Sequence, residues 1–506
     1  MLICIMADNL KQRTISGVVW SAIHKFASML LGFISGIVLA RLLTPHDYGV
    51  IGMLTIFLAI AQTFIDGGFG SALIQKKNPT DEDYSTILYW NLGLSVFLYL
   101  VLFGCAPFIA RFYDLPLLSD VLRVQGLVLI INAARIVQRN QLRKRLEMKK
   151  VALINVSSSV VSLLVTIYLA WCGWGVWALV AQQLLLGVLC TTLYWITTRW
   201  IPVLTFSTKS FKELFSFGGF VLLSNLFNTF CNNIQGLLIG KIYNSSTLGY
   251  YTKARTTETY ASTFISSVLD QVCYPVLSES QNERERLIAI IKKFIGVSAF
   301  LTFPLMLILM LLAKPIFILL YSDRWLPSVP YFQILCFAGI AICLQGINYY
   351  AVAAIGKSKD LFVWTIVKRC VGLGFILAGL SLWGIEGLLV GMVFGSFSIY
   401  IINAALASKH VGYTLNQQMK DLMPIILLSA VSTFSALVWP IILTCNMYVM
   451  GLLQLTTFGV VYMVGSVLLK LEAFESTKEV LGVLISKYKK NNNNDYNRKT
   501  LFGARR

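Results

Sequence analysis

Long apolar blocks alternate with short polar connections along most of the chain. Blocks of about 20 or more apolar residues are typical of helices that cross a membrane, because about twenty helical residues span the hydrocarbon layer. None of the polar connections is long enough to form a soluble catalytic domain. The pattern predicts fourteen spans, at 14–39, 48–74, 86–107, 115–134, 151–171, 174–197, 214–240, 247–277, 290–312, 329–354, 361–382, 384–407, 422–443 and 447–469.

Composition and charge placement support a membrane protein and argue against nucleic-acid binding. Of the 506 residues, 57% are hydrophobic and 13% are charged, whereas a soluble protein carries about 25% charged residues. The net charge of +19 is unevenly placed. If the N-terminus is cytoplasmic, most of the 42 Lys and Arg residues fall on cytoplasmic connections, as the positive-inside rule expects. The richest segment, 135–150, is predicted to be a solvated loop that touches anionic lipid head groups.

Two internal matches indicate a repeat. The segment ARLLTPHDYGVI (40–51) aligns with GKIYNSSTLGYY (240–251), and WGVWALVA (174–181) aligns with WGIEGLLV (383–390). Each pair occupies the same place in successive groups of six predicted helices, which suggests two lobes of like orientation that bind substrate between them. We therefore expect an all-α integral membrane protein. Its parts are an N-lobe at 1–205, a C-lobe at 206–420, two extra helices at 421–470 and a basic, Asn-rich cytoplasmic tail at 471–506.

Four predicted helices carry polar residues along one face, because successive helix residues rotate by about 100°. These polar stripes pack helices together in some proteins, and the charged members could also form salt bridges that hold the lobes together. Ionisable residues inside membranes, however, usually face a water-filled cavity, and we expect the stripes to line one. They contain Lys25 and Ser28, then Gln62 and Asp66, then Asn225, Asn228, Asn232 and Gln235, and finally Arg255, Ser262 and Asp270.

Local phrases of this sequence resemble a known transporter family. They are LARLLTPHDYGVIGM (39–53), LGYYTKA (248–254) and CYPVLSE (273–279). Together with the predicted lobes, they resemble Wzx-type polysaccharide flippases, in particular the colanic-acid-exporter-like members of the multidrug/oligosaccharidyl-lipid/polysaccharide (MOP) superfamily. The resemblance covers about residues 10–470.

This resemblance implies a transporter and not an enzyme. Its substrate would be an undecaprenyl-pyrophosphate-linked oligosaccharide, a repeat unit of O-antigen, capsule or exopolysaccharide, flipped across the bacterial inner membrane by alternating access. Lys25 and Arg255 match the cationic cavity residues that hold the lipid pyrophosphate in relatives. Asp66 and Asp270 are candidates for coupling to a proton or sodium gradient, and Glu258, which lies off the main stripe, is a further one.

The resemblance also implies partners and a location. No cofactor or metal is expected, and the partners are the lipid-linked glycan and membrane lipids, with a polysaccharide polymerase or chain-length protein as a further candidate. The chain is expected to be a monomer with both termini in the cytoplasm.

Two other functions are compatible with parts of the pattern. A multidrug or organic-cation exporter of the same superfamily would share the fold, but its cavity should favour carboxylates over Lys and Arg. A pathway enzyme such as a polysaccharide polymerase usually has a sizeable periplasmic loop, and no long outward loop is predicted here.

Overall fold

The computed structural model describes residues 2–479, in which the regular elements are helices. Residues 480–506 of the predicted tail lie outside the described residues. The side chain of Asp270 also lies outside what the structure describes. By its internal contacts the chain divides into two compact units.

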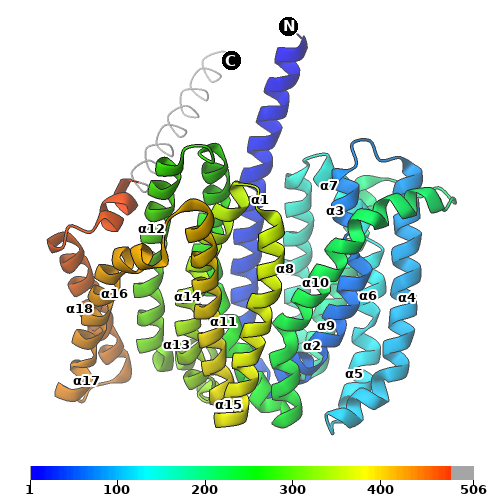
Figure 1. The fold of residues 1–506 in the computed structure, drawn as a ribbon. Helices are drawn as coiled ribbons and strands as arrows, with labels where there is room; N and C mark the ends of the chain where they lie inside the picture. Colours follow the sequence, from blue (N-terminus) through cyan, green and yellow to red (C-terminus); the bar gives the residue numbers. More distant parts are fainter. Residues whose placement is uncertain (1, 480–506) are drawn as a thin grey trace, which may run out of the picture. The chain divides into compact units, whose positions relative to one another are not determined.

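Unit 1 comprises the chain up to Lys253 together with Leu320–Ser328. Within it, α1 packs on α8, α8 on α9, and α2 on α10 (Figure 1). Its helices are α1 (Leu2–Leu42), α2 (Pro45–Asp66), α3 (Phe69–Gln75), α4 (Asp81–Phe112), α5 (Leu117–Gln125), α6 (Leu127–Ala133), α7 (Ile136–Lys144), α8 (Met148–Trp171), α9 (Val176–Thr198), α10 (Thr208–Ile242), the start of α11 (Ser245–Glu279) and the 3₁₀ turn η1 (Asp323–Trp325).

Unit 2 comprises Ala254–Leu319 and the chain from Val329 onward. Within it, α16 packs against both α12 and α18 (Figure 1). Besides the rest of α11, its helices are α12 (Arg284–Leu311), most of α13 (Ala313–Tyr321), α14 (Ser328–Ala354), α15 (Ser358–Val411), α16 (Leu415–Leu437), α17 (Trp439–Ile442) and α18 (Met447–Leu468). Residues 472–479, at the start of the predicted tail, are helical.

Local sequence signals determine where many helices begin and end. At the start of α2, the Thr44 hydroxyl accepts a hydrogen bond from the Asp47 amide, and the Asp47 carboxylate accepts one from the Thr44 amide. This capping box satisfies amide groups that lack a partner in the first turn. Thr80 and Asp83 form the same arrangement at the start of α4. Gly67, with φ of 50°, ends α2 in the left-handed conformation that glycine adopts at little cost.

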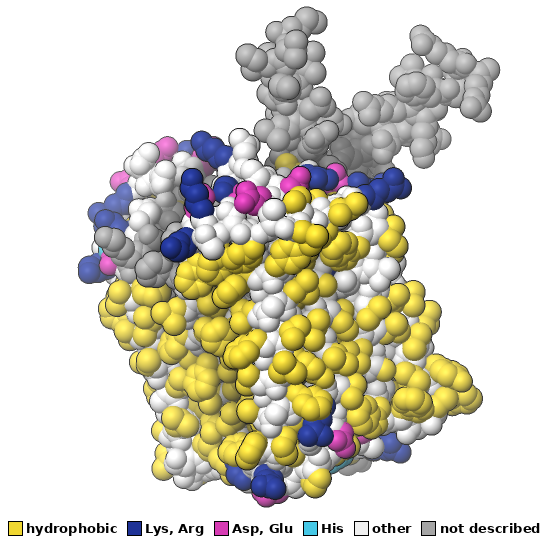
Figure 2. Space-filling model, turned by 90° about the vertical axis from the view of Figure 1, so that its right-hand side faces the viewer, with side chains coloured by type: hydrophobic (Ala, Val, Ile, Leu, Met, Phe, Trp, Pro, Cys, Tyr) yellow, Lys and Arg dark blue, Asp and Glu magenta, His cyan; other side chains and the backbone are white. Residues whose placement is uncertain are grey.

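The helices confirm the predicted all-α membrane fold. Eleven segments of the described chain are long and apolar enough to cross a membrane. One of them, Asp360–Val411, covers two predicted spans, and α15 is broken between them at Trp383 and Gly384. The helices α10 and α11 cover the spans predicted at 214–240 and 247–277 but are not among the eleven, so the count of fourteen stays a prediction. Figure 2 shows apolar side chains across the middle of one face, with charged side chains gathered toward two ends.

The interpretation of residues 135–150 as a solvated loop is wrong. Ile136–Lys144 form α7, which packs against α3, α8 and α9. Gln138, with no exposed surface, and Gln141, with 2%, are buried. The Lys144 ammonium donates to the carbonyl oxygens of Leu73 and Ile74 at 3.0 and 3.4 Å and so caps the end of α3. The segment is amphipathic, and its positive charge alone had suggested exposure.

The compact units and the repeat divide the chain differently. α10 belongs to unit 1, because it packs along α2, although it opens the second repeat. Residues 245–253 and 320–328, also from the second repeat, belong to unit 1 as well. The lobe boundary at 205 and 206 describes the repeat and stays a prediction.

Candidate functional site

The predicted polar stripes of α1, α2 and α10 all lie in unit 1. Lys25 is exposed on α1, in a span that is otherwise apolar. Asn225 and Asn232 are exposed on α10, and Ser28 and Asn228 are half-buried. Gln235 is buried and donates a hydrogen bond to the carbonyl of Cys231 at 3.3 Å.

The helices α2 and α10 contact each other through polar side chains. The hydroxyl groups of Thr63 and Thr229 lie 3.0 Å apart and share a hydrogen bond. Thr63 was not part of the predicted stripe on α2, whereas Thr229 lies on the predicted face of α10. A polar contact at this depth satisfies both hydroxyl groups without water.

Gln62 connects Asp66 to α6. The Gln62 amide nitrogen donates to the Asp66 carboxylate at 3.3 Å, and its amide oxygen accepts a hydrogen bond from Asn132 at 3.2 Å. The positive charges of Arg139 and Arg135 also act on Asp66. The structure therefore places the carboxylate beside cationic residues that the sequence had assigned to a loop.

In unit 2, Arg255 is paired with Glu258. The two side chains form an ion pair of 3.1 Å one turn apart on α11. Glu258 has no exposed surface, whereas 36% of the Arg255 side chain is exposed. The second Glu258 oxygen, Oε1, has no hydrogen-bond partner among the described residues. Glu258, predicted only as an additional coupling residue, is thus the buried counter-ion of Arg255.

Two further predicted residues lie on the same helix. Ser262 is buried, and its hydroxyl lies 3.4 Å from the carbonyl oxygen of Thr259. Asp270 follows two turns later, and its side chain is outside the described part of the structure. The assignments of all these residues to substrate or ion binding stay predictions.

A buried lysine that the sequence pattern did not single out lies on α11, beside the C-terminal end of α1. Lys253 is 4% exposed, and its ammonium donates to the carbonyl oxygen of Gly36. The same ammonium lies 4.1 Å from the ring centre of Tyr321, 5.1 Å from that of Tyr48 and 5.5 Å from that of Trp325. Aromatic faces attract a desolvated cation. The phrase LGYYTKA contains Lys253, but its aromatic partners are distant in sequence.

Beside this lysine, the first turns of α2 and α11 cross at two glycines. An ideal Cβ atom on Gly49 would lie 1.7 Å from the carbonyl oxygen of Ser245, and one on Gly249 would lie 1.9 Å from that of Pro45. The two contacts are reciprocal, and the two glycines are 200 positions apart, at matching places in the repeat. Only glycine allows the backbones to approach this closely.

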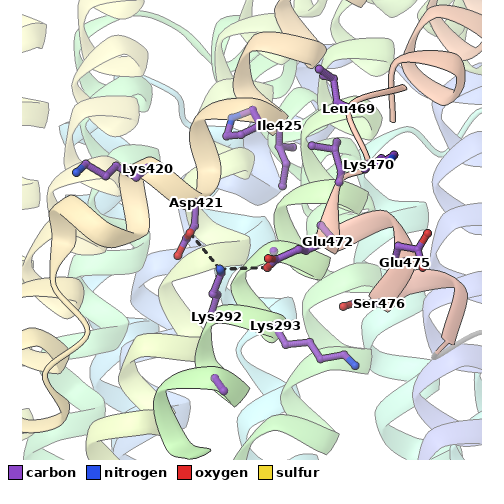
Figure 3. Close-up of a pocket in the computed structure, with 15 residues that line it drawn as sticks. Lys292, Lys293, Lys420, Asp421, Ile425, Leu469, Lys470, Glu472, Glu475 and Ser476 are labelled. Carbon is purple, nitrogen blue, oxygen red and sulfur yellow. Dashed lines mark ion pairs between the residues drawn. The ribbon is translucent and has the colours of Figure 1, made fainter. Parts of the chain in front are cut away.

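A cavity of about 770 Å³ lies in unit 2 between α12, α16 and the segment after α18. Figure 3 shows the Lys292 ammonium between two carboxylates, 3.4 Å from Asp421 and 3.1 Å from Glu472. Tyr413 donates to Asp421 at 2.6 Å, and burial together with this hydrogen bond raises the pKa of Tyr413. These contacts attach residues after Leu471 to the helices of unit 2.

Replacing Lys292 with alanine should have a small effect. Its side chain is 40% exposed, and ion pairs at exposed positions contribute about 0–1 kcal/mol. We expect the melting temperature of the purified protein in detergent to fall by no more than about 2 °C. Lys293→Ala, which removes the 2.7 Å pair with Glu479, should behave alike. A much larger loss for Lys292→Ala would show that this pair is essential for folding.

The comparison with protein families decides the identity. Residues 38–330, more than half of the chain, match the family described as "Polysaccharide biosynthesis protein". The chain belongs to this family. The match includes Asp66, Arg255, Glu258 and the glycine crossing, and it begins after Lys25.

Curated relatives agree with this assignment. The chain is 26% identical over 358 residues to the teichuronic acid biosynthesis protein TuaB of Bacillus subtilis, with 70% of this chain and 74% of TuaB covered. It is 24% identical over 406 residues to the lipopolysaccharide biosynthesis protein WzxC of Escherichia coli, with 79% and 81% covered.

Among solved structures, the lipid II flippase MurJ in an inward closed conformation has a similar fold. The TM-score is 0.74 at 15% sequence identity, and the superposition covers 89% of this chain and 98% of MurJ. At this identity the likeness concerns the fold. It supports the helical architecture of this member of the polysaccharide biosynthesis family.

Proposed function

We propose that this protein moves an undecaprenyl-pyrophosphate-linked oligosaccharide across a bacterial cytoplasmic membrane by alternating access. The observation that carries the proposal is membership of the polysaccharide biosynthesis family in a multi-pass helical protein. Relatives named for teichuronic acid and lipopolysaccharide biosynthesis, and a fold shared with a lipid II flippase, support it. The repeat unit would belong to an O-antigen, capsule or exopolysaccharide.

The polar residues fit such cargo. A pyrophosphate that leaves water needs hydrogen-bond donors and positive charges in exchange, because an unpaired charge in an apolar medium is very costly. Lys25 and the half-exposed Arg255 provide positive charge on predicted cavity faces. The amides of Asn225 and Asn232 are exposed on α10 and can hydrogen-bond sugar hydroxyls. The lipid tail can remain in the surrounding membrane.

The cycle requires one end of the protein to open and close. We infer that the crossing of Gly49 with Gly249, together with Lys253 and its aromatic neighbours, closes the periplasmic end. Asp66 and Glu258 are the carboxylates we nominate for coupling to proton or sodium flow, since a carboxylate that alternates between protonated and paired forms can bias two conformations. In this proposal both termini are cytoplasmic, and the chain acts as a monomer beside a polysaccharide polymerase or chain-length protein.

Deletion of the gene tests the proposed function directly. We expect a lipid-linked glycan to accumulate on the cytoplasmic leaflet, because synthesis continues while export stops. Extraction of polyprenyl-linked glycans, with mass spectrometry and a leaflet-selective label, measures this. Unchanged glycan pools together with normal surface polysaccharide would contradict the proposal. Accumulation of an organic cation in its place would favour a drug exporter.

Substitution of Lys25 tests the predicted pyrophosphate contact. Lys25→Ala should reduce polysaccharide export in a deletion strain by about tenfold or more, because a hydrogen bond to a charged group contributes about 1.5–3 kcal/mol. Lys25→Arg should retain most export. Lys212→Ala removes an exposed lysine at the start of α10 and serves as the control, with export unchanged. Normal export by an abundant Lys25→Ala protein would show that Lys25 does not bind the substrate.

A further inference from the structure

Three arginines lie on one face of α7, which packs against α3, α8 and α9. Arg135 immediately precedes α7, and Arg139 and Arg143 follow at intervals of four residues. Residues four apart are neighbours on a helix surface, about 6 Å apart along its axis. Arg135 and Arg139 are half-buried and Arg143 is exposed. We call these three residues the arginine ladder.

The ladder concentrates positive charge inside unit 1. The charge of Arg139 acts on both Arg135 and Arg143, and the charge of Arg143 reaches His24 on α1. In the described part of the chain, none of the three guanidinium groups makes an ion pair within 4 Å. Like charges this close repel one another unless an anion lies between them.

Asp66 supplies part of the compensation. The positive charges of Arg139 and Arg135 act on its carboxylate. The same carboxylate accepts a hydrogen bond of 3.3 Å from the side-chain amide of Gln62. One carboxylate cannot balance three guanidinium groups, so the ladder keeps excess positive charge. The Tyr194 hydroxyl, which accepts a hydrogen bond from Asn155 at 3.1 Å, is a neutral neighbour of the ladder.

Several buried polar atoms on or near α7 have no hydrogen-bond partner among the described residues. They are Nε of Arg139, Oδ1 of Asn132 and both amide atoms of Gln138. Native proteins leave few buried polar atoms unpaired, because each costs free energy unless a partner is supplied. A guanidinium nitrogen that is buried and unpaired is available to a ligand that brings its own acceptor oxygens.

We propose that the arginine ladder binds the diphosphate group of the lipid-linked substrate, and that Asp66 is the internal counter-ion which this diphosphate replaces. The inference rests on the proposed function and adds anion-binding residues of unit 1 to the predicted contacts of Lys25 and of Arg255. Planar guanidinium groups bind phosphate oxygens through paired hydrogen bonds. Two arginines one turn apart can hold the two phosphates, and the charge of Arg143 also acts on His24 of α1.

Binding of a short prenyl diphosphate tests the site. The full-length protein is placed in phosphatidylcholine nanodiscs, and farnesyl diphosphate is titrated as the probe. We expect Arg139→Gln to weaken binding by at least about tenfold, and Arg139→Lys to weaken it less. Asp66→Asn should tighten binding several-fold, because the competing carboxylate is gone. A purely structural Asp66 would not produce this tightening.

Matched controls separate the ladder from general positive charge. Arg145→Gln removes an exposed arginine just after α7 and should leave binding within about twofold. If Arg139→Gln fails to fold, the binding measurement is made on the double variant Arg139→Gln with Asp66→Asn. This variant removes the arginine and the nearby carboxylate charge together. Equal loss in Arg145→Gln, or unchanged binding in Arg139→Gln, would overturn the proposal. So would equal binding of farnesyl monophosphate, or full competition by phosphatidylglycerol.

Failure of this site can be distinguished from failure of the proposed function. If the deletion strain accumulates a lipid-linked glycan while Arg139→Gln binds the probe normally, the ladder proposal is wrong and the function stands. If the probe depends on Arg139 but deletion leaves glycan pools unchanged, the ladder binds diphosphate and the transported substrate is a different one.

Discussion

Replacing Gly49 with alanine is expected to abolish polysaccharide export, because the arrangement described here has no space for a methyl group. The new Cβ would lie 1.7 Å from the Ser245 carbonyl oxygen, and a backbone atom cannot turn aside as a flexible side chain can. Overpacking costs about 1–3 kcal/mol or more, and about 3 kcal/mol shifts a conformational equilibrium more than a hundredfold. Gly249→Ala should have the same effect, because its Cβ would lie 1.9 Å from the Pro45 carbonyl.

Gly52 provides the control on the same helix. A Cβ atom there would lie 3.2 Å from side-chain atoms of Leu248, which can move slightly. We therefore expect Gly52→Ala to retain export. Export in the deletion strain and thermal unfolding in detergent measure the three variants. If Gly49→Ala folds and exports like Gly52→Ala, the two helices do not cross this closely in any state the cycle requires.

Replacing Arg255 with methionine should strongly destabilise unit 2. The change leaves Glu258, which has no exposed surface, without its ion-pair partner at 3.1 Å. Leaving a buried charged group without its partner costs about 1–3 kcal/mol, and the 36% exposure of Arg255 keeps the cost below the about 3–5 kcal/mol of a fully buried pair. The double variant Arg255→Met with Glu258→Leu should recover most of the stability. Thermal unfolding of the purified proteins measures both effects.

An exposed pair of the same spacing gives the reference. Arg286 and Glu283 also lie three residues apart, at 3.4 Å, but their side chains are 59% and 61% exposed. Arg286→Met should cost less than about 1 kcal/mol. The double variant also separates two roles of Arg255, since restored stability without export would assign the arginine to substrate. Restored export would show that Arg255 contributes to stability and not to substrate binding. Equal stability of all variants would show that the ion pair does not stabilise the fold.

Hydropathy alone located the helices well. The two spans predicted at 361–382 and 384–407 fall on either side of the break in α15 at Trp383 and Gly384. The capping boxes at Thr44 and Thr80 lie within four residues of chain. Such signals are local, because hydrogen bonds of a helix and its caps join near neighbours. The all-α fold followed from them.

The partners of the charged residues could not be predicted in the same way. The segment 135–150 was interpreted as a solvated loop because it is rich in Lys and Arg, and the structure folds it into α7 with buried amides. Lys253 was not noticed, because its aromatic partners Tyr321 and Trp325 lie about seventy residues further on. Glu258 is only a further candidate for ion coupling by sequence, because it lies off the polar stripe of its helix.

The sequence by itself determined which segments form long apolar helices, with their ends placed to within several residues. Those properties depend on the transfer of side chains out of water and on hydrogen bonds within a turn or two. Only the tertiary structure decided which partners the charged residues have: Glu258 for Arg255, Gln62 for Asp66, and aromatic rings for Lys253. Electrostatic and cation–π energies depend on distance in space and on burial, and neither can be read from spacing along the chain.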